Sequence, residues 1–187
     1  MKIGVLALQG AVKPHLVKLK SLGVEGVQVR KPEHLQGLSG IIIPGGESST
    51  FIHLLKLNHL WEPLIEFAKQ KPTWGICAGA ILLSSEVRSP EQEALGLLPI
   101  RATRNAYGRQ LESFIDDLIW EKTHEKVEGV FIRAPKLTAL DESVKVLATY
   151  GEEPVMLEKD HLLVSAFHPE LTDSPLMHEY FINKCHG

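Results

Sequence analysis

A chain of 187 residues, with 44% hydrophobic and 23% charged residues, has the size and composition of one globular domain with a substantial core. We therefore expect residues 1–187 to form a single domain. The net charge of −3 lacks the basic excess of nucleic-acid-binding proteins, and no apolar run approaches the length of a membrane span. These properties argue against nucleic-acid partners and against a membrane protein.

The first half of the chain alternates between strand and helix patterns. Compact apolar or alternating runs predict strands at residues 2–8, 24–30, 40–46 and 73–77. Helical patterns follow these strands at residues 14–23, 47–58, 62–71 and 78–86. This order is typical of βαβ units in a mostly parallel sheet.

Two of the predicted helices carry signals for their faces and ends. The helix at 14–23 ends at Gly23, and its apolar face consists of Leu16, Val17, Leu19 and Leu22. The helix at 47–58 has Ser48 or Ser49 as its expected N-cap.

The second half of the chain is less regular. Strands are predicted at residues 129–135, 144–150 and 161–170, and a closing helix at residues 175–185. Short returns between the later strands are typical of antiparallel hairpins. The chain is therefore predicted to be an α/β protein with a mixed, mostly parallel sheet.

Cysteine usage and the N-terminus indicate a compartment. Cys77 and Cys185 are the two cysteines of the chain, too few for a disulfide framework, which favours a reducing environment. Residues 2–8 lack a signal-cleavage pattern and read as a strand. We expect a cytoplasmic protein.

Cys77 lies where a predicted strand turns into a helix, between Gly75 and Gly79. This Gly-x-Cys-x-Gly arrangement matches the nucleophile elbow, and a helix beginning at Ala78 favours a thiolate at its N-terminus. A lone cysteine in an apolar stretch is equally often a small buried side chain. The elbow alone therefore leaves catalysis and packing equally supported.

His168 differs from the other eight histidines, most of which are expected at the surface. It ends an apolar strand, and the following proline favours extended backbone, so that Glu170 projects to the same side. A carboxylate at this spacing can orient the imidazole of a catalytic base. Alone, "HPE" is more often a strand end; together with the elbow, it predicts a Cys77–His168–Glu170 triad.

Acyl transfer also needs donors for an oxyanion. The amides of Gly45 and Gly46, after a buried strand, offer one half, and the amide of Ala78 the other. A Gly-Gly pair is equally consistent with an ordinary strand-to-helix turn. Phosphate-loop and metal-ligand spacings are missing from the sequence, so we expect neither a metal nor a cofactor.

Three motifs carry a family resemblance: "PGGES", "GICAG" and "FHPE" in this order resemble class I (triad-type) glutamine amidotransferases. More narrowly, the chain resembles the family of glutaminase subunits of pyridoxal 5′-phosphate synthases. That match rests on "VLALQGAV", "IPGGESST", "RNAYGRQLESF" (104–114), "FIRAP" and "FHPELTD". Together these segments span nearly the whole chain.

The resemblance implies a flavodoxin-like three-layer α/β/α fold and a set of roles. Cys77 would attack the side-chain amide of L-glutamine, with His168 as base and acid, Glu170 orienting it, and Gly46 and Ala78 forming the oxyanion hole. The glutamine contacts implied by the motifs are Gly45, Gly46, Glu47, Arg104, Ile132 and Arg133. Guanidinium groups suit the α-carboxylate of glutamine, and a carboxylate suits its α-ammonium.

The resemblance also implies a partner. A glutaminase alone wastes glutamine, because free ammonia is protonated in water. The family implies delivery to a (β/α)₈-barrel synthase subunit within a large hetero-oligomer, with docking ordering the region of Gln9–Gly10 and Gly45–Gly46.

Two other readings stay open. The chain could be another class I glutaminase subunit, such as one serving imidazole glycerol phosphate synthase, because the triad is shared. It could also be a flavodoxin-like binding or stress-response module with a redox-sensing cysteine, although such a module has no need of "HPE".

Overall fold

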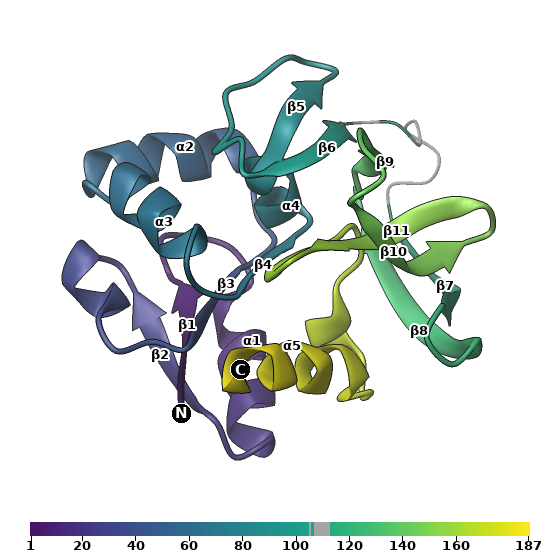
Figure 1. The fold of residues 1–187 in the computed structure, drawn as a ribbon, viewed down its shortest axis with the longest axis horizontal. Helices are drawn as coiled ribbons and strands as arrows, with labels where there is room; N and C mark the ends of the chain where they lie inside the picture. Colours follow the sequence, from purple (N-terminus) through teal and green to yellow (C-terminus); the bar gives the residue numbers. More distant parts are fainter. Residues whose placement is uncertain (105, 107–112) are drawn as a thin grey trace.

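The computed structural model describes residues 1–104, 106 and 113–187, and its ribbon shows helices on both faces of a long twisted sheet (Figure 1). Within this part of the chain the main sheet has nine strands in the order β2-β1-β3-β4-β12-β11-β10-β7-β8. These strands are β1 (Lys2–Leu6), β2 (Glu25–Val29), β3 (Gly40–Ile43), β4 (Thr73–Ile76), β7 (Ser113–Trp120), β8 (Glu125–Ile132), β10 (Lys145–Tyr150), β11 (Glu153–Lys159) and β12 (Leu162–Ser165).

Five adjacent strands, from β2 to β12, pair in parallel and form the core of the sheet. Every residue of β3, β4 and β12 is buried, as expected for strands covered on both faces. The α-helices of the described residues are α1 (Val12–Ser21), α2 (Ser48–Leu57), α3 (Trp61–Ala68), α4 (Ala78–Leu83) and α5 (Leu176–His186). Figure 1 shows α1 and α5 on one face of the parallel strands and α2, α3 and α4 on the other. The predicted three-layer α/β fold is confirmed.

The remaining strands of the main sheet are antiparallel. β12, β11 and β10 follow one another through short turns, and β7 pairs with both β10 and β8. The predicted hairpins at the end of the chain are therefore present, and the sheet is mixed.

A second sheet, of three strands, was not predicted. It consists of β5 (Ser84–Arg88), β6 (Leu98–Thr103) and β9 (Lys136–Ala139), in the order β5-β6-β9. The helix expected to reach residue 86 ends at Leu83, where the Ser84 hydroxyl donates to the Ala80 carbonyl at 2.8 Å. Residues from Ser84 onward pair with β6 instead. Such long-range pairing overrides a local helical pattern.

Two expectations about helix ends and faces are corrected. Glu47, rather than Ser48 or Ser49, is the N-cap of α2, because its carboxylate accepts from the Thr50 amide at 3.1 Å. On α1, Val17 is 59% exposed, although it was expected on the apolar face.

Most histidines were expected at the surface, but two of them are not there. His15 on α1 and His178 on α5 are both fully buried. They lie between the helix layer and the sheet, where Trp74 of β4 contacts both rings edge-on.

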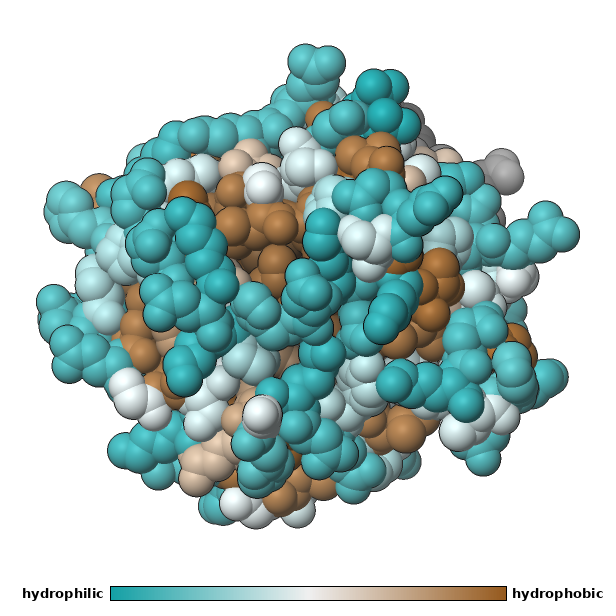
Figure 2. All heavy atoms as spheres, in the orientation of Figure 1, coloured by the Kyte–Doolittle hydropathy of each residue, from teal (hydrophilic) through white to brown (hydrophobic). Residues whose placement is uncertain are grey.

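The outer surface is mainly polar. On the face seen in Figure 2, hydrophilic residues cover most of the surface, and hydrophobic residues form small patches among them. None of the helices in the described residues is long and apolar enough to cross a membrane.

A short 3₁₀ turn, η3 (Pro169–Leu171), follows β12, and another, η1 (Pro32–Leu35), follows β2. The segments after β1, β3, β4 and β12 all leave the same edge of the sheet, because these strands are parallel neighbours. In open α/β sheets this carboxyl edge is where ligands bind. The topology therefore brings the candidate residues of these segments to one place.

Candidate active site

Cys77 stands at a sharp turn between β4 and α4. Its backbone has φ +50° and ψ −100°, a conformation rarely adopted by residues other than glycine. The Cys77 amide donates to the Ser165 carbonyl at 2.8 Å, and the Ile81 amide donates to the Cys77 carbonyl at 3.1 Å. These bonds fix both sides of the turn, so the elbow predicted from the sequence is present.

The elbow depends on the absence of a side chain at Gly79. A Cβ atom there would lie 2.1 Å from the Ile43 carbonyl oxygen of β3. Because the opposing atom is backbone, no side-chain movement can relieve this contact. Glycine therefore lets α4 start directly against the sheet and holds Cys77 at its edge.

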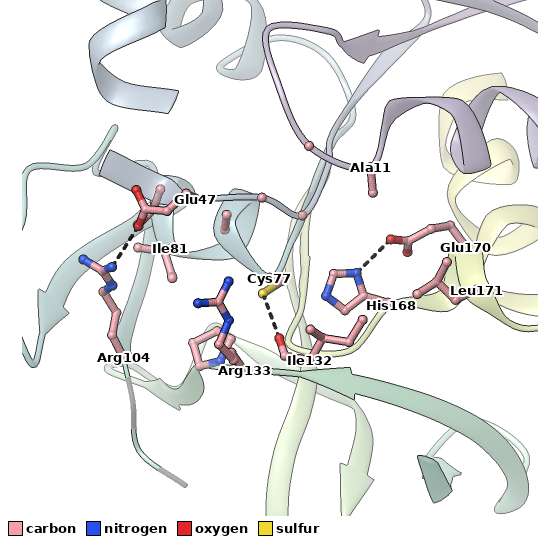
Figure 3. Close-up of a pocket in the computed structure, with 16 residues that line it drawn as sticks. Ala11, Glu47, Cys77, Ile81, Arg104, Ile132, Arg133, His168, Glu170 and Leu171 are labelled. Atoms are coloured by element: carbon pink, nitrogen blue, oxygen red, sulfur yellow. Dashed lines mark hydrogen bonds and ion pairs between the residues drawn. The ribbon is translucent and has the colours of Figure 1, made fainter. Parts of the chain in front are cut away.

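His168 and Glu170 form the predicted pair. His168 Nδ1 and Glu170 Oε1 are 2.8 Å apart, and both residues are only 6% exposed. Figure 3 shows Cys77 on one side of the imidazole and Glu170 on the other. The His168 amide also donates to the Val130 carbonyl at 2.7 Å, which anchors the histidine to β8.

The electrostatics of His168 favour its protonated form. Burial acts to lower the pKa of His168, but the neighbouring Cys77 and the hydrogen-bonded Glu170 carboxylate outweigh it and raise the pKa to about 10. An imidazolium at neutral pH is the partner that a reactive thiolate requires.

The predicted glutamine-binding residues line one pocket with the triad. A cavity of about 340 Å³ is bounded by residues from six segments of the chain. Its lining includes Gly45, Gly46, Glu47, Cys77, Ala78, Arg104, Ile132, Arg133, His168 and Glu170. The structure thus brings together every site residue expected from the sequence. The rest of the motif that begins at Arg104 falls largely on residues 105 and 107–112, outside the described residues.

Charged groups on one wall of the pocket are already paired. Arg104 Nη2 lies 2.9 Å from Glu47 Oε1, and Arg104 Nη1 donates to Gln92 Oε1 at 2.9 Å. Burial acts to raise the pKa of the Glu47 carboxyl, but hydrogen bonds from Ser49 and Thr50, together with Arg104, hold it below its ordinary value. The Glu47 carboxylate is therefore charged at neutral pH, and the contact with Arg104 orients it.

The other wall carries the strained residue Arg133, with φ +44°, next to Ile132. The Ile132 carbonyl accepts from the Cys77 thiol at 3.8 Å, a dashed line in Figure 3. Arg133 is exposed at the pocket mouth.

Sequence reasoning did not identify Gln92, which supports this wall. Its side-chain oxygen accepts from both Ser48 (3.0 Å) and Arg104 (2.9 Å), linking the start of α2 to the residue that follows β6. Gln92 lies in an irregular segment without a periodic signal, so only the folded contacts reveal it.

Gln9 is hydrogen-bonded next to the glycine turn, Gly45–Gly46, which follows β3. Its side-chain amide donates to the Glu47 carbonyl at 2.9 Å and accepts from the Glu47 amide at 3.3 Å. The Ala11 amide donates to the Gly45 carbonyl at 3.0 Å. Because C=O and N–H point oppositely in a trans peptide, the Gly46 amide faces away from Ala11.

Comparisons with known proteins agree on one family. The model of the SNO glutamine amidotransferase family matches residues 5–187. The chain is 50% identical over 190 residues to a protein named pyridoxal 5′-phosphate synthase subunit PdxT from Carboxydothermus hydrogenoformans, covering 100% of both chains. It is 47% identical over 184 residues to the protein of the same name from Thermosipho africanus, covering 98% of each.

Solved structures give the same picture of the fold. A crystal structure described as a glutamine amidotransferase is 44% identical, covers 99% of both chains and superposes with a TM-score of 0.92. The structure of PurLQS from Thermotoga maritima, at 18% identity and a TM-score of 0.75, shares the fold alone.

Proposed function

The chain belongs to the SNO glutamine amidotransferase family, and we propose that it hydrolyses L-glutamine to L-glutamate and ammonia at Cys77. The ammonia is delivered to a partner synthase that makes pyridoxal 5′-phosphate, the synthase named for its relatives. Residues 1–187 act as one glutaminase domain, working in the cytoplasm.

The first half-reaction releases ammonia. The Cys77 thiolate attacks the carboxamide carbon of the glutamine side chain, forming a C–S bond and a tetrahedral oxyanion. The amides of Gly46 and Ala78 donate to this oxyanion. The His168 imidazolium gives its proton to the amide nitrogen, the C–N bond breaks, and ammonia leaves a γ-glutamyl thioester behind.

The second half-reaction restores the enzyme. Neutral His168 takes a proton from water as the water oxygen attacks the thioester carbon. The tetrahedral intermediate expels the Cys77 thiolate and releases glutamic acid, which loses its proton to solvent. Throughout, Glu170 keeps the imidazole oriented and stabilises its charged form.

Substrate orientation comes from the pocket walls. The α-ammonium of glutamine lies against Glu47, and its α-carboxylate against Arg104 and Arg133, with further contacts from Gly45 and the Ile132 backbone. The 2.9 Å pairing of Glu47 with Arg104 supports this assignment, because it places opposite charges side by side, as in the zwitterionic head of an amino acid.

The observation that carries the proposal is the meeting of Cys77, His168 and Glu170 in a pocket with a paired carboxylate and guanidinium on its wall. The test is ammonia release from L-glutamine in the presence of synthase. Substituting any triad residue with alanine abolishes or severely reduces the rate, whereas Cys185→Ser retains it. Unchanged turnover in Cys77→Ala contradicts the mechanism.

The partner is proposed to be a (β/α)₈-barrel synthase subunit in a large hetero-oligomer. Docking acts on the segment of Gln9 and Gly10. The Gln9 side chain is hydrogen-bonded to the Glu47 backbone, and the residue after Gly10, Ala11, donates to the Gly45 carbonyl. A shift of this segment moves the Gly46 amide. We expect the glutaminase rate to rise when synthase is added, and equal rates with and without it refute this coupling.

The nearest alternative is a glutaminase serving another synthase. The names of the relatives favour the pyridoxal 5′-phosphate branch. Affinity capture with each purified synthase separates the two. A redox-sensing module without catalysis is the outcome if glutamine is never hydrolysed, even with synthase present.

A further inference from the structure

Two more buried histidines, His15 and His178, lie beyond Glu170 on the side away from His168. Glu170 Oε1 meets His168, while its other oxygen, Oε2, lies 3.6 Å from His15 Nε2. His15 Nδ1 in turn lies 3.0 Å from His178 Nε2. His15 and His178 are completely buried, as is the Glu170 side chain.

The contact between Glu170 and His15 joins two atoms that lack other partners. Among the described residues, neither Glu170 Oε2 nor His15 Nε2 has a hydrogen bond. Buried polar atoms left unpaired are costly, and these two are complementary. A shift of about half an ångström closes a hydrogen bond between them, and catalytic hydrogen bonds often tighten in this way when substrate binds.

The number of ring N–H groups determines which histidine nitrogens donate and which accept between His178 and Glu170. For His15 Nε2 to donate to the carboxylate, a neutral His15 must accept at Nδ1, and His178 must donate from Nε2. His178 thereby selects the tautomer of His15, as a carboxylate selects that of a catalytic histidine. Every N–H from His178 to Glu170 then points toward the triad.

The surroundings keep both histidines neutral. Burial lowers the pKa of His15, with further lowering from His178 and His168, and burial lowers the pKa of His178 to about 3, with Lys18 adding to the effect. Trp74 packs edge-on against both rings, with centroid distances of 6.4 Å to His15 and 5.1 Å to His178. A neutral His15, held by a neutral His178, can therefore support the carboxylate without adding a competing charge.

We propose that His15, with its tautomer held by His178, is a positioning residue that orients Glu170 toward His168. This inference rests on the proposed glutaminase function. It adds a second donor to the catalytic carboxylate, supplied by α1, whose preceding residues Gly10 and Ala11 line the pocket. The geometry of α1 is thereby linked to the base as well as to the glycine turn.

The test compares leucine with glutamine at both positions, in a Cys185→Ser background with synthase present. Leucine removes the donor, whereas glutamine keeps an N–H near the position of imidazole Nε2. We expect His15→Leu to lower kcat by about ten-fold, the loss of one hydrogen bond to a charged group, with little change in KM. His15→Gln recovers most of the rate, and His178→Leu lowers kcat while His178→Gln retains it.

Because His178 acts through His15, the two leucine substitutions are not additive. In the His15→Leu background, His178→Leu causes little further loss of kcat, as a double-mutant cycle will show. The matched control is His161→Leu, which removes a half-buried imidazole bonded to the Ala68 carbonyl at 2.8 Å, away from the pocket lining. It leaves kcat unchanged.

A second readout is independent of glutamine. The rate at which iodoacetamide alkylates Cys77 at neutral pH reports the reactivity of the sulfur, which depends on the placement of the His168 imidazole beside it. This rate falls in His15→Leu and recovers in His15→Gln. Equal alkylation and kcat in all four variants, with folding verified by thermal melting, overturns the positioning role. Absent glutamine hydrolysis in the parent protein refutes the proposed function instead, and alkylation still decides the role of His15.

Discussion

Gly45→Ala is the substitution that tests the position of the proposed catalytic imidazole, that of His168, most sharply. A Cβ atom at residue 45 would lie 2.4 Å from His168 Cε1 and 3.1 Å from His168 Nδ1. Ordinary contact begins at 3.4 Å, so the imidazole must move by about 1 Å or the glycine turn must retreat. A displacement of about 1 Å of a reacting group costs on the order of 100-fold in rate, or about 3 kcal/mol.

The assay is kcat for ammonia release with saturating glutamine and synthase. We expect a loss of about 100-fold in Gly45→Ala, together with slower alkylation of Cys77. The matched control is Gly26→Ala on β2, where the Cβ would meet the tip of the Leu16 side chain at 2.8 Å. That side chain can turn away, and it lies outside the pocket lining, so kcat stays at the parent level.

A Gly45→Ala protein that melts at the parent temperature and keeps its full kcat refutes the reasoning. It would mean that the His168 imidazole does not transfer protons from the position it has in the structure, packed against Gly45. A loss of folding without a change in kcat per folded molecule would refute it equally.

Three further predictions follow from other contacts. Arg104→Lys keeps the charge but loses the forked contacts to Glu47 and Gln92. We therefore expect steady-state kinetics to show KM for glutamine about ten-fold higher, with a smaller change in kcat. A fall in kcat alone contradicts the assignment of Arg104 to substrate binding. Burial lowers the pKa of His178 to about 3, below the 6.5 of an ordinary histidine, so as the pH falls the unfolded chain binds the proton first. The contribution of His178 to the free energy of unfolding is therefore complete above about pH 6.5. It falls toward pH 3 by about 1.4 kcal/mol per pH unit. Urea unfolding across this range will therefore show a shallower acid decline in His178→Gln, and identical slopes contradict the burial of a neutral imidazole. Burial raises the pKa of the Cys185 thiol to about 12, so iodoacetamide at neutral pH labels Cys77 and spares Cys185; comparable labelling of both, measured by peptide mass spectrometry, contradicts this.

The sequence predicted the parallel core and the elbow because both leave strong local signals. The unbroken isoleucines of β3 indicated burial on both faces, and the small residues around Cys77 indicated a tight turn. The pairing of His168 with Glu170 followed from their spacing at a strand end.

Features that depend on contacts between distant segments could not be predicted. Ser84 leaves a helical pattern because β6 pairs with it, and Glu47 caps α2 while also bonding to Arg104. His15 is an instructive case, because it lies four residues before the buried Leu19 and so shares its face of α1. The spacing is present in the sequence, but a histidine is a polar residue and was expected at the surface. Its burial is explained by its neighbours in the fold, His178 and Glu170.

We propose that Cys77 releases ammonia from glutamine for use by a docked synthase. The most direct measurement is ammonia release from L-glutamine by the purified chain and by its Cys77→Ala variant, each with and without the pyridoxal 5′-phosphate synthase subunit. We expect slow release by the parent alone, a marked increase with synthase, and none from Cys77→Ala in either case. Ammonia release that persists in Cys77→Ala, or that never appears in the parent with synthase, contradicts it.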